Sequence, residues 1–540
     1  MTRCSSPPRW LWAAWFVALV LIVVVRRVID TGDSGFTNVL TAALLFLAAL
    51  IGVVWFVFRS AHSAKLRYGS LVALIAVILL LPWVVEVRGF SGEMVPALGL
   101  RGGVATGPAA DVPVAPGAAI DLMATTPYDF AGFLGSGRNM RVDNVRLAHD
   151  WETAAPELLW KQPVGAGWGG YAVVNGYAAT IEEREGRELV TLYDVETGDL
   201  IWAREIGGAF HHVLGGAGPR STPLIHEGVV YAMGVRGHLV ALEGATGSIV
   251  WERDLLADYG ISIAEEDANV AYGRPTSPLV VGDGLIVGVG GSVDRRVSAV
   301  AYQKGHGEVL WEGGDRNISM ASPGHGVLAG AEQVLLVNEN WVSGHDPATG
   351  QVLWEFPWPG ITAADSSVSQ AVPVPPDKVF VSKGYGGGAA LYQLDASSDG
   401  TFTAEELWHS ARVMRTKLTN VALKDGYVYG LSEGVLECVD LATGERVWKA
   451  GRYHHGQILL VGDVLLVLSE EGELFMVEAS PESRNNVLAQ FQAIEGHTWN
   501  TFALYGDIVL VRNAQEAAAY RLPLDLPLMF PAEFEDASEQ

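Results

Sequence analysis

The pattern of apolar and polar positions divides the chain into an apolar beginning and a long remainder of short, alternating segments. Three long apolar stretches open the chain and predict helices over residues 10–28, 39–58 and 68–85. Crossing the apolar core of a bilayer takes about 20 residues of helix, with a range of about 17 to 25. We therefore expect residues 1–90 to form a multi-pass anchor whose partner is the lipid bilayer.

The first apolar stretch also fits a cleaved signal peptide. However, no small-residue cleavage site follows it, and Arg26 and Arg27 stand there instead. Whether the stretch is retained stays open. Basic residues in the short loops number five on the N-terminal side and four on the other side, which favours an N-terminus inside the cell. The chain after residue 85 then lies on the side of the membrane opposite to the N-terminus. We expect an inner (cytoplasmic) membrane protein with its larger part on the periplasmic side.

Two further segments read as connections rather than as parts of a core. Residues 91–125 are predicted to form a flexible linker, because residues 102–119 are rich in Gly, Ala, Val and Pro and show no periodicity. Residues 523–540 contain several prolines and then turn acidic, which is typical of a tail without its own core.

Between these segments, residues 126–522 repeat a motif that reads acidic residue, two residues, Thr-Gly, three residues, Trp. Its clear copies lie at residues 194–202, 243–251, 346–354 and 440–448. With two degenerate copies and the first marker, tryptophans recur at spacings of 40 to 60 residues, and periods in this range are typical of propeller blades. The series is Trp160, Trp202, Trp251, Trp311, Trp354, Trp408 and Trp448.

Each residue of the motif has a physical task. The acidic residue and the threonine hydrogen-bond to the turn backbone, and the glycine adopts the positive φ that such a hairpin turn requires. The tryptophan begins the next strand, and its ring can lie between neighbouring blades. We therefore expect the seven tryptophans to be structural.

The repeat predicts an all-β domain: an eight-bladed β-propeller of four-stranded antiparallel blades, preceded by about three transmembrane α-helices. Phe491 replaces tryptophan in the last marker position. The final unit lacks an outermost strand, and residues 158–161 can supply it from the start of the domain. Such closure leaves no exposed edge where the ends of the domain meet.

The repeat resembles the PQQ-repeat (quinoprotein-like) propellers, which include quinoprotein alcohol and glucose dehydrogenases and the non-enzymatic, BamB-like assembly factors. The resemblance covers about residues 150–522, and residues 129–133 and 159–165 look like an uncharacterised membrane-anchored branch. It implies a binding or scaffold protein with partners among other envelope proteins. The alternative is a PQQ-dependent membrane-bound oxidoreductase of the alcohol or sugar dehydrogenase type. The family's alcohol dehydrogenases carry adjacent cysteines, whereas the two here are Cys4 and Cys438.

The formal net charge of −25 argues against nucleic acid as a partner, because its phosphates require a basic surface. Basic and aromatic residues nevertheless gather in the segments that cross from one blade to the next. Such a mouth fits a planar ligand with several carboxylates, and PQQ is the first candidate. Alternatively, the same side chains satisfy backbone carbonyls. The candidate ligand-binding residues are Arg220, Arg274, Arg415, Lys417, Trp168 and Trp499.

One turn matches the spacing of a calcium-binding loop, with Asp395, Ser397, Asp399, Thr401 and Glu406 as candidate ligands. A strand precedes the turn where an EF-hand would have a helix, so an elongated hairpin turn is the alternative. We identify no catalytic residue, because serines and histidines occur in no spacing that indicates a triad.

Overall fold

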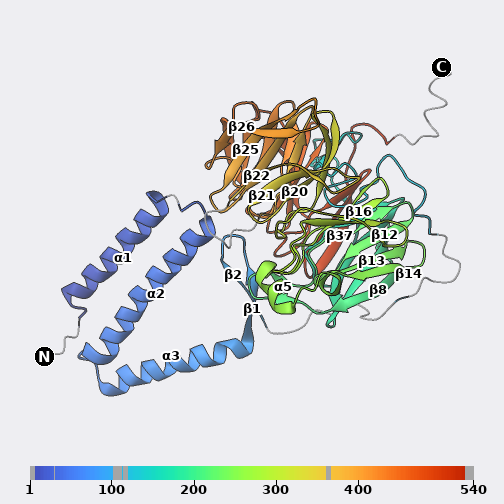
Figure 1. Cartoon of the computed structure of the whole chain (residues 1–540). Helices are drawn as coiled ribbons and strands as arrows, with labels where there is room; N and C mark the ends of the chain where they lie inside the picture. The colour runs from blue at the N-terminus through green and yellow to red at the C-terminus, as the bar shows by residue number, and fades with distance from the viewer. Residues whose placement is uncertain (1–5, 30, 101–111, 113–119, 360–366, 529–540) are drawn as a thin grey trace. The chain divides into compact units, whose positions relative to one another are not determined.

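The computed structural model describes residues 6–29, 31–100, 112, 120–359 and 367–528. Two compact units make up the chain, Met1–Gly103 and Val104–Gln540. Figure 1 shows helices in the first unit and mainly strands in the second.

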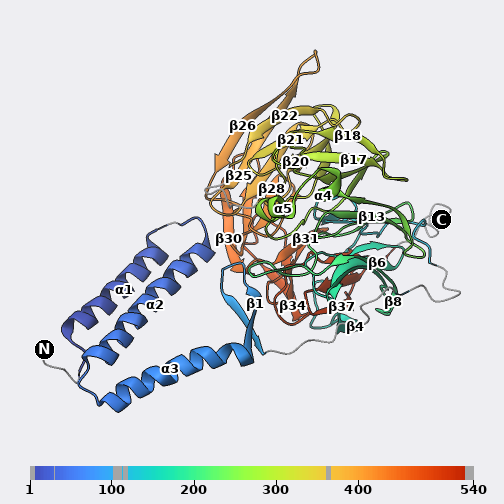
Figure 2. The same ribbon diagram turned by 60° about the horizontal axis from the view of Figure 1, so that its bottom comes forward.

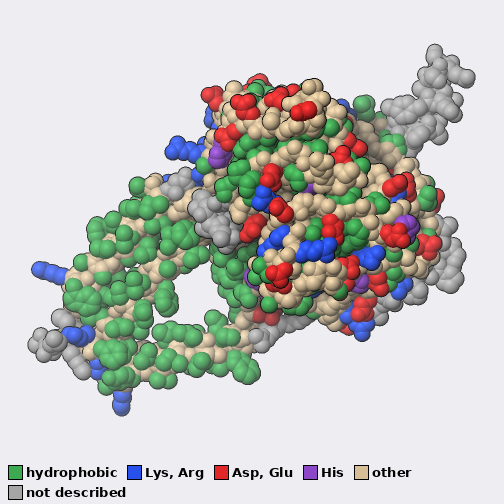
Figure 3. Space-filling model, in the orientation of Figure 1, with side chains coloured by type: hydrophobic (Ala, Val, Ile, Leu, Met, Phe, Trp, Pro, Cys, Tyr) green, Lys and Arg blue, Asp and Glu red, His purple; other side chains and the backbone are tan. Residues whose placement is uncertain are grey.

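The first unit contains the three apolar helices that the sequence predicts, α1 (Arg9–Arg27), α2 (Ser34–Arg59) and α3 (Ala64–Val84). Each is long and apolar enough to cross a membrane, and Figure 3 shows apolar side chains covering them. α2 begins five residues before the predicted start because the Asp33 side chain accepts a hydrogen bond from Phe36 N and caps the helix. Trp15 of α1 donates to Ala48 O of α2 at 3.0 Å, which ties the two helices together.

The described part of the second unit contains eight sheets in which four strands follow one another antiparallel. The first two are β5 (Ala172–Val174), β6 (Tyr177–Arg184), β7 (Arg187–Asp194), β8 (Leu200–Gly208), and β11 (Leu224–His226), β12 (Val229–Met233), β13 (His238–Glu243), β14 (Ile249–Asp254). The next two are β15 (Leu279–Val281), β16 (Gly284–Gly288), β17 (Ala299–Gln303), β18 (Val309–Gly313), and β19 (Gly324–Leu328), β20 (Ala331–Val337), β21 (Trp341–His345), β22 (Val352–Pro357).

Two further sheets are β23 (Val372–Val374), β24 (Lys378–Lys383), β25 (Gly388–Ala396), β26 (Phe402–Ser410), and β27 (Ala422–Lys424), β28 (Tyr427–Ser432), β29 (Val435–Asp440), β30 (Arg446–Arg452). The last two are β31 (Gln457–Val461), β32 (Val464–Leu468), β33 (Glu473–Glu478), β34 (Val487–Gln492), and β35 (Ala503–Tyr505), β36 (Ile508–Arg512), β37 (Glu516–Arg521), β4 (Glu157–Pro163). A short strand, β3 (Arg141–Val142), joins β31 in parallel. Figure 2 shows the sheets arranged one after another.

Burial differs systematically between inner and outer strands. β16, β32 and β36 are buried at every position, which requires cover on both faces of the sheet. In the outermost strand β14, by contrast, only Trp251 is buried. The cores therefore lie between neighbouring sheets, and each sheet's outer strand faces solvent.

The predicted pairing of residues 158–161 with the last unit is present. β4 pairs antiparallel with β37, and Trp160 lies opposite Ala519. This sheet combines both ends of the domain.

The segment predicted as a linker, residues 91–125, contains regular structure in its described part. It contains β2 (Pro96–Leu100), which forms a hairpin with β1 (Val85–Phe90). Leu122 is 3% exposed and belongs to a core cluster with residues of β6 and β12. Of residues 102–119, all but Val112 lie outside the described residues.

The strap, defined here as residues 120–142, crosses several innermost strands. Phe130 forms a bridge with Val173 of β5, and Met140 O accepts from Leu460 N of β31. Arg138 donates to Pro278 O at 2.7 Å, close to the start of β15. The strap thus links sheets that are distant in sequence, which its irregular sequence did not indicate. Of the tail, Leu524 bridges to Leu147, and residues 529–540 lie outside the described part.

Candidate functional site

The repeated tryptophans connect each sheet to the next. Trp202 of β8 donates from Nε1 to Gly244 O in the following sheet at 2.9 Å, and a Cβ built on Gly247 would lie 2.8 Å from its ring. The glycine of each Thr-Gly turn therefore provides both a positive φ and a flat surface for the preceding ring. The same kind of bond to a backbone carbonyl is made by Trp160, Trp251, Trp311, Trp408 and Trp448.

Trp354 departs from this pattern for a local reason. The sheet after it has the elongated β25–β26 turn in place of a Thr-Gly turn, so no such glycine faces the ring. Its Nε1 donates instead to Gln333 Oε1 within its own sheet at 2.6 Å. Phe356 continues the contact by stacking on Tyr392 of the next sheet, with ring centroids 3.6 Å apart.

Polar groups at the starts of the innermost strands form hydrogen bonds from each sheet to the next. These bonds join consecutive sheets around the whole set, and the last sheet is joined to the first. They are Gly170 N to Thr222 Oγ1, Thr222 N to Ser277 Oγ, Ser277 N to Ser322 Oγ, Met320 N to Ser367 O, Gln370 N to Asn420 Oδ1, Gln457 Nε2 to Leu418 O and to Trp499 O, and Asn500 Nδ2 to Gly167 O.

The crossings, which lead from the outermost strand of one sheet to the innermost strand of the next, contain the predicted ligand-binding cations. Arg220 lies in the crossing from the first sheet to the second, which contains the short strands β9 (His211–His212) and β10 (Gly216–Ala217). Its side chain is half-buried between these strands and the crossing that follows. Its Nε donates to Tyr272 O at 2.9 Å and its Nη2 to Gly216 O at 3.0 Å. Burial lowers the pKa of this guanidinium. Arg220 thus satisfies backbone carbonyls, which is the alternative to ligand binding that the sequence left open.

Arg274 forms a buried ion pair. Its guanidinium donates through Nε and Nη2 to the two carboxylate oxygens of Glu266, at 2.7 and 2.8 Å. Arg274 is fully buried and Glu266 is 1% exposed. Glu266 lies on α5 (Ile263–Asn269), a helix inserted into this crossing after α4 (Leu255–Asp258). The pair fixes the inserted helix to the start of the third sheet.

Arg415 and Lys417 lie in a later crossing. Arg415 Nε donates to Ala411 O at 2.7 Å. Lys417 is 5% exposed, with its ammonium 4.9 Å from the centroid of the Tyr385 ring.

The two aromatic candidates meet at the junction of the last and first sheets. The Trp168 and Trp499 rings pack against each other at 5.1 Å with planes inclined by 43°, and His497 contacts both. Trp499 donates from Nε1 to the buried Glu470 carboxylate at 2.8 Å. Burial lowers the pKa of His497. The rings form a compact cluster instead of two parallel surfaces around a planar ligand.

Several residues predicted for PQQ contact the protein's own groups, and PQQ binding at these residues stays a prediction. Arg274 is neutralised by Glu266, Arg220 is held by carbonyls, and the tryptophan rings contact each other.

The candidate calcium ligands are not brought together. They lie in the β25–β26 hairpin, in which Tyr392 pairs with Glu406 and donates to its Oε2 at 3.0 Å. Asp399 lies in the turn, where its Oδ1 accepts from Thr401 N. With a rise of about 3.3 Å per residue along a strand, Glu406 is too far from Asp399 to share a cation with it. Within the described residues, no group of three or more His, Cys, Asp and Glu is placed to hold a metal.

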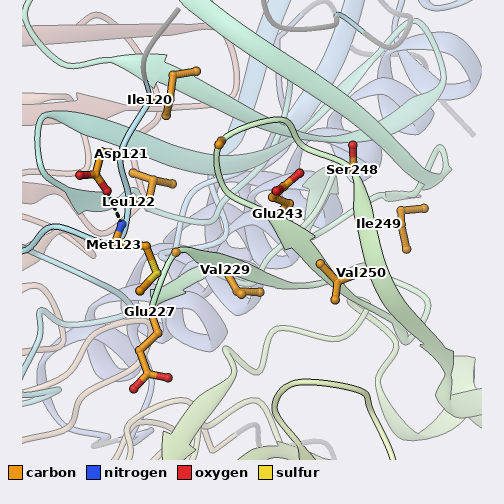
Figure 4. Close-up of a pocket in the computed structure, with 12 residues that line it drawn as sticks. Ile120, Asp121, Leu122, Met123, Glu227, Val229, Glu243, Ser248, Ile249 and Val250 are labelled. Atoms are coloured by element: carbon orange, nitrogen blue, oxygen red, sulfur yellow. Dashed lines mark hydrogen bonds between the residues drawn. The ribbon is translucent and has the colours of Figure 1, made fainter.

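A hollow of about 400 Å³ lies on a different part of the surface, between the strap and the second sheet. Figure 4 shows Leu122 and Met123 of the strap facing Val229, Ile249 and Val250. Three carboxylates lie around it, those of Asp121, Glu227 and Glu243. Sequence analysis did not predict this groove, because its walls are separated by about a hundred residues and nothing in the local pattern links them.

Repeated four-stranded sheets joined by tryptophan contacts place the chain in the class of β-propeller-type proteins built from PQQ-like repeats. The sequence model of the family described as outer membrane protein assembly factor BamB matches residues 143–312 and 186–450, together more than half of the chain. The chain belongs to this family. No curated protein sequence matches the chain.

Solved structures with TM-scores of 0.50 and 0.55 support the same fold. A europium-containing methanol dehydrogenase has a TM-score of 0.55 at 12% identity, covering 73% of this chain and 98% of its own. Quinohemoprotein alcohol dehydrogenase from Comamonas testosteroni has a TM-score of 0.50 at 14% identity, covering 75% and 82%. BamB from Moraxella catarrhalis has a TM-score of 0.46 at 14% identity, covering 68% and 100%. At these identities the likeness concerns the fold alone.

Proposed function

We propose that this chain is a membrane-anchored binding or scaffold protein whose propeller lies on the periplasmic side of the inner membrane and binds other envelope proteins. The observation that carries the proposal is the continuity of three membrane-length helices with a propeller of the BamB family. The cations of the crossings support a role without catalysis, since Arg220 and Arg274 are engaged by the protein's own groups.

The eight sheets form a closed, eight-bladed propeller in this proposal. Two observations support it: the hydrogen bonds that lead from Asn500 back to Gly167, and the pairing of β4 with β37. A closed ring presents its outer strands and turns to solvent on all sides, as a scaffold requires.

Titration with PQQ distinguishes the scaffold proposal from the alternative, a PQQ-dependent dehydrogenase. We expect calorimetry of the full chain in detergent to detect no binding of PQQ, and dye reduction with added PQQ and alcohols or sugars to stay at background. The physical reason is the internal engagement of Arg220 and Arg274. Micromolar binding that weakens in Arg415→Ala, or PQQ-dependent dye reduction, would contradict the scaffold proposal.

The orientation is tested by a reporter fusion. Alkaline phosphatase fused after Arg101 is expected to be active, because three spans with the N-terminus inside place that position in the periplasm. A fusion of the same enzyme after His62, between α2 and α3, serves as the internal control and is expected to be inactive. The reverse pattern of activities would overturn the proposed topology.

A further inference from the structure

The outermost strands of the first two sheets have matching sequences in different surroundings. Residues 200–204 of β8 read LIWAR, and residues 249–253 of β14 read IVWER. Val112, from the segment before the strap, pairs with the outer edge of β8. It exchanges two backbone hydrogen bonds with Ala203, both 3.0 Å long. Covered in this way, Ala203 is 2% exposed.

β14 has no such cover among the described residues. It is hydrogen-bonded to β13 on one side, and its other edge is the edge of the sheet. Ile249 and Val250 are 45% and 49% exposed, whereas the corresponding Leu200 and Ile201 of β8 are only partly exposed. An uncovered edge with adjacent apolar side chains is a template for an added strand.

The groove lies at the start of β14 and has both apolar side chains and carboxylates around it. A β-bulge at Val250 breaks the alternation of β14, and Ile249 and Val250 both line the hollow as a result (Figure 4). The Asp121 and Glu243 carboxylates are exposed and form no ion pair among the residues that the structure describes. Glu227, the third carboxylate, is paired with Lys304 at 2.9 Å.

We propose that this groove binds an extended segment of a partner protein, with alternating apolar and basic side chains, which pairs with the outer edge of β14. The segment repeats on the second sheet what Val112 does on the first. Its backbone pairs with β14, its apolar side chains cover Ile249 and Val250, and its basic side chains approach Asp121 and Glu243. This inference rests on the proposed scaffold function and names the chemistry of the partner.

The first test uses synthetic peptides. A fluorescein-labelled peptide of about six alternating Val and Lys residues, the length of a typical strand, is titrated against the full chain in detergent micelles and followed by anisotropy. We expect saturable binding. A peptide with Glu in place of Lys is expected to bind more weakly by about tenfold or more, because the groove carries carboxylates. N-methylating alternate amides of the peptide is expected to weaken binding by about tenfold or more, since one hydrogen bond contributes about that factor. Equal binding of the N-methylated peptide would overturn strand addition.

Matched variants locate the binding to this edge. Val250→Lys is expected to weaken binding of the Val-Lys peptide by about tenfold, because apolar contact is lost and a charge of the same sign as the peptide's is added. Val447→Lys is the control: Val447 occupies the same motif position on β30, is 43% exposed, and does not line the groove. The double variant Asp121→Asn, Glu243→Gln should weaken binding and reduce its dependence on salt.

Equal weakening by Val447→Lys would overturn the assignment, because it would indicate adsorption to the acidic surface as a whole. The failure of this inference is distinguishable from failure of the scaffold proposal. If the chain does not bind the peptide, but the phosphatase fusion is active and there is no PQQ-dependent activity, the scaffold proposal stands. The partner then binds at another surface.

Discussion

Replacing Trp202 by alanine is expected to lower the free energy of unfolding by about 3–5 kcal/mol, the range for large aromatic side chains removed from a core. The side chain is fully buried between the first two sheets. Its loss also leaves Gly244 O without the indole donor that lies 2.9 Å away. Denaturant unfolding of the full chain in detergent, followed by tryptophan fluorescence and circular dichroism, measures the change.

Two controls accompany this variant. Trp202→Phe keeps a ring against Gly247 and loses the hydrogen bond, so it should cost clearly less than the alanine variant. Val447→Ala, on the exposed side of β30, should change the stability by less than about 0.5 kcal/mol. If Trp202→Ala unfolds at the denaturant concentration of the unchanged chain, the tryptophans do not hold the sheets together.

The second large effect is expected at the junction of the last and first sheets. Arg512 of β36 is fully buried and donates to Thr180 Oγ1 at 2.5 Å and to Gly165 O at 2.9 Å. Nearby, the buried Glu182 accepts from Arg184 at 3.1 Å. Arg512→Met should cost about 3–5 kcal/mol, because it leaves buried acceptors unpaired and removes a positive charge from the surroundings of Glu182.

The cost of Arg512→Met should also depend on pH. Burial disfavours the charged form of Glu182, but Arg184 and Arg512, together with hydrogen bonds from Tyr193 and Thr191, outweigh it and hold the pKa of that carboxyl below its ordinary value. A carboxyl with a lowered pKa stabilises the fold above its ordinary pKa, and this stabilisation is lost as the pH falls through the lowered value. The variant lacks part of this stabilisation. The stability gap between the variant and the unchanged chain should therefore be larger at about pH 7 than at about pH 4.

Arg521→Met is the matched control for this junction. Arg521 lies on β37 of the same sheet and pairs with Glu196 at 2.7 Å, but the Arg521 and Glu196 side chains are 37% and 58% exposed. Exposed pairs contribute about 0–1 kcal/mol. A cost for Arg512→Met as small as that for Arg521→Met would show that the buried arginine does not secure the junction.

Much of the fold could be predicted because its signals are local. The three helices follow from unbroken apolar stretches, and their ends differ from prediction by more than one residue only at the starts of α2 and α3, where Asp33 and Ser63 cap the helices. The Thr-Gly turns place strands and tryptophans at regular intervals, since turn chemistry acts within a few residues. Phe491, read as a substituted marker, does pack between sheets, against Trp151 and Tyr520.

The candidate site was less accessible to sequence reasoning. The basic residues of the crossings were visible, but their partners were not. Glu266, which neutralises Arg274, lies on an inserted helix that the repeat pattern does not predict. The β25–β26 turn has the spacing of a calcium loop, yet hairpin pairing separates Glu406 from Asp399. Spacing along a chain specifies a ligand set only when the backbone conformation is also known.

The sequence by itself therefore determined the apolar helices, the repeated four-stranded unit and the residues that connect one unit to the next. Hydrophobic periodicity and turn chemistry are properties of neighbouring residues, and both can be read directly. Only the tertiary structure decided which charges are neutralised, where the strap runs, and that Ile249 and Val250 are about half exposed beside Asp121 and Glu243. These features arise from contacts between residues far apart in the chain, whose energies depend on burial and geometry that no local pattern contains.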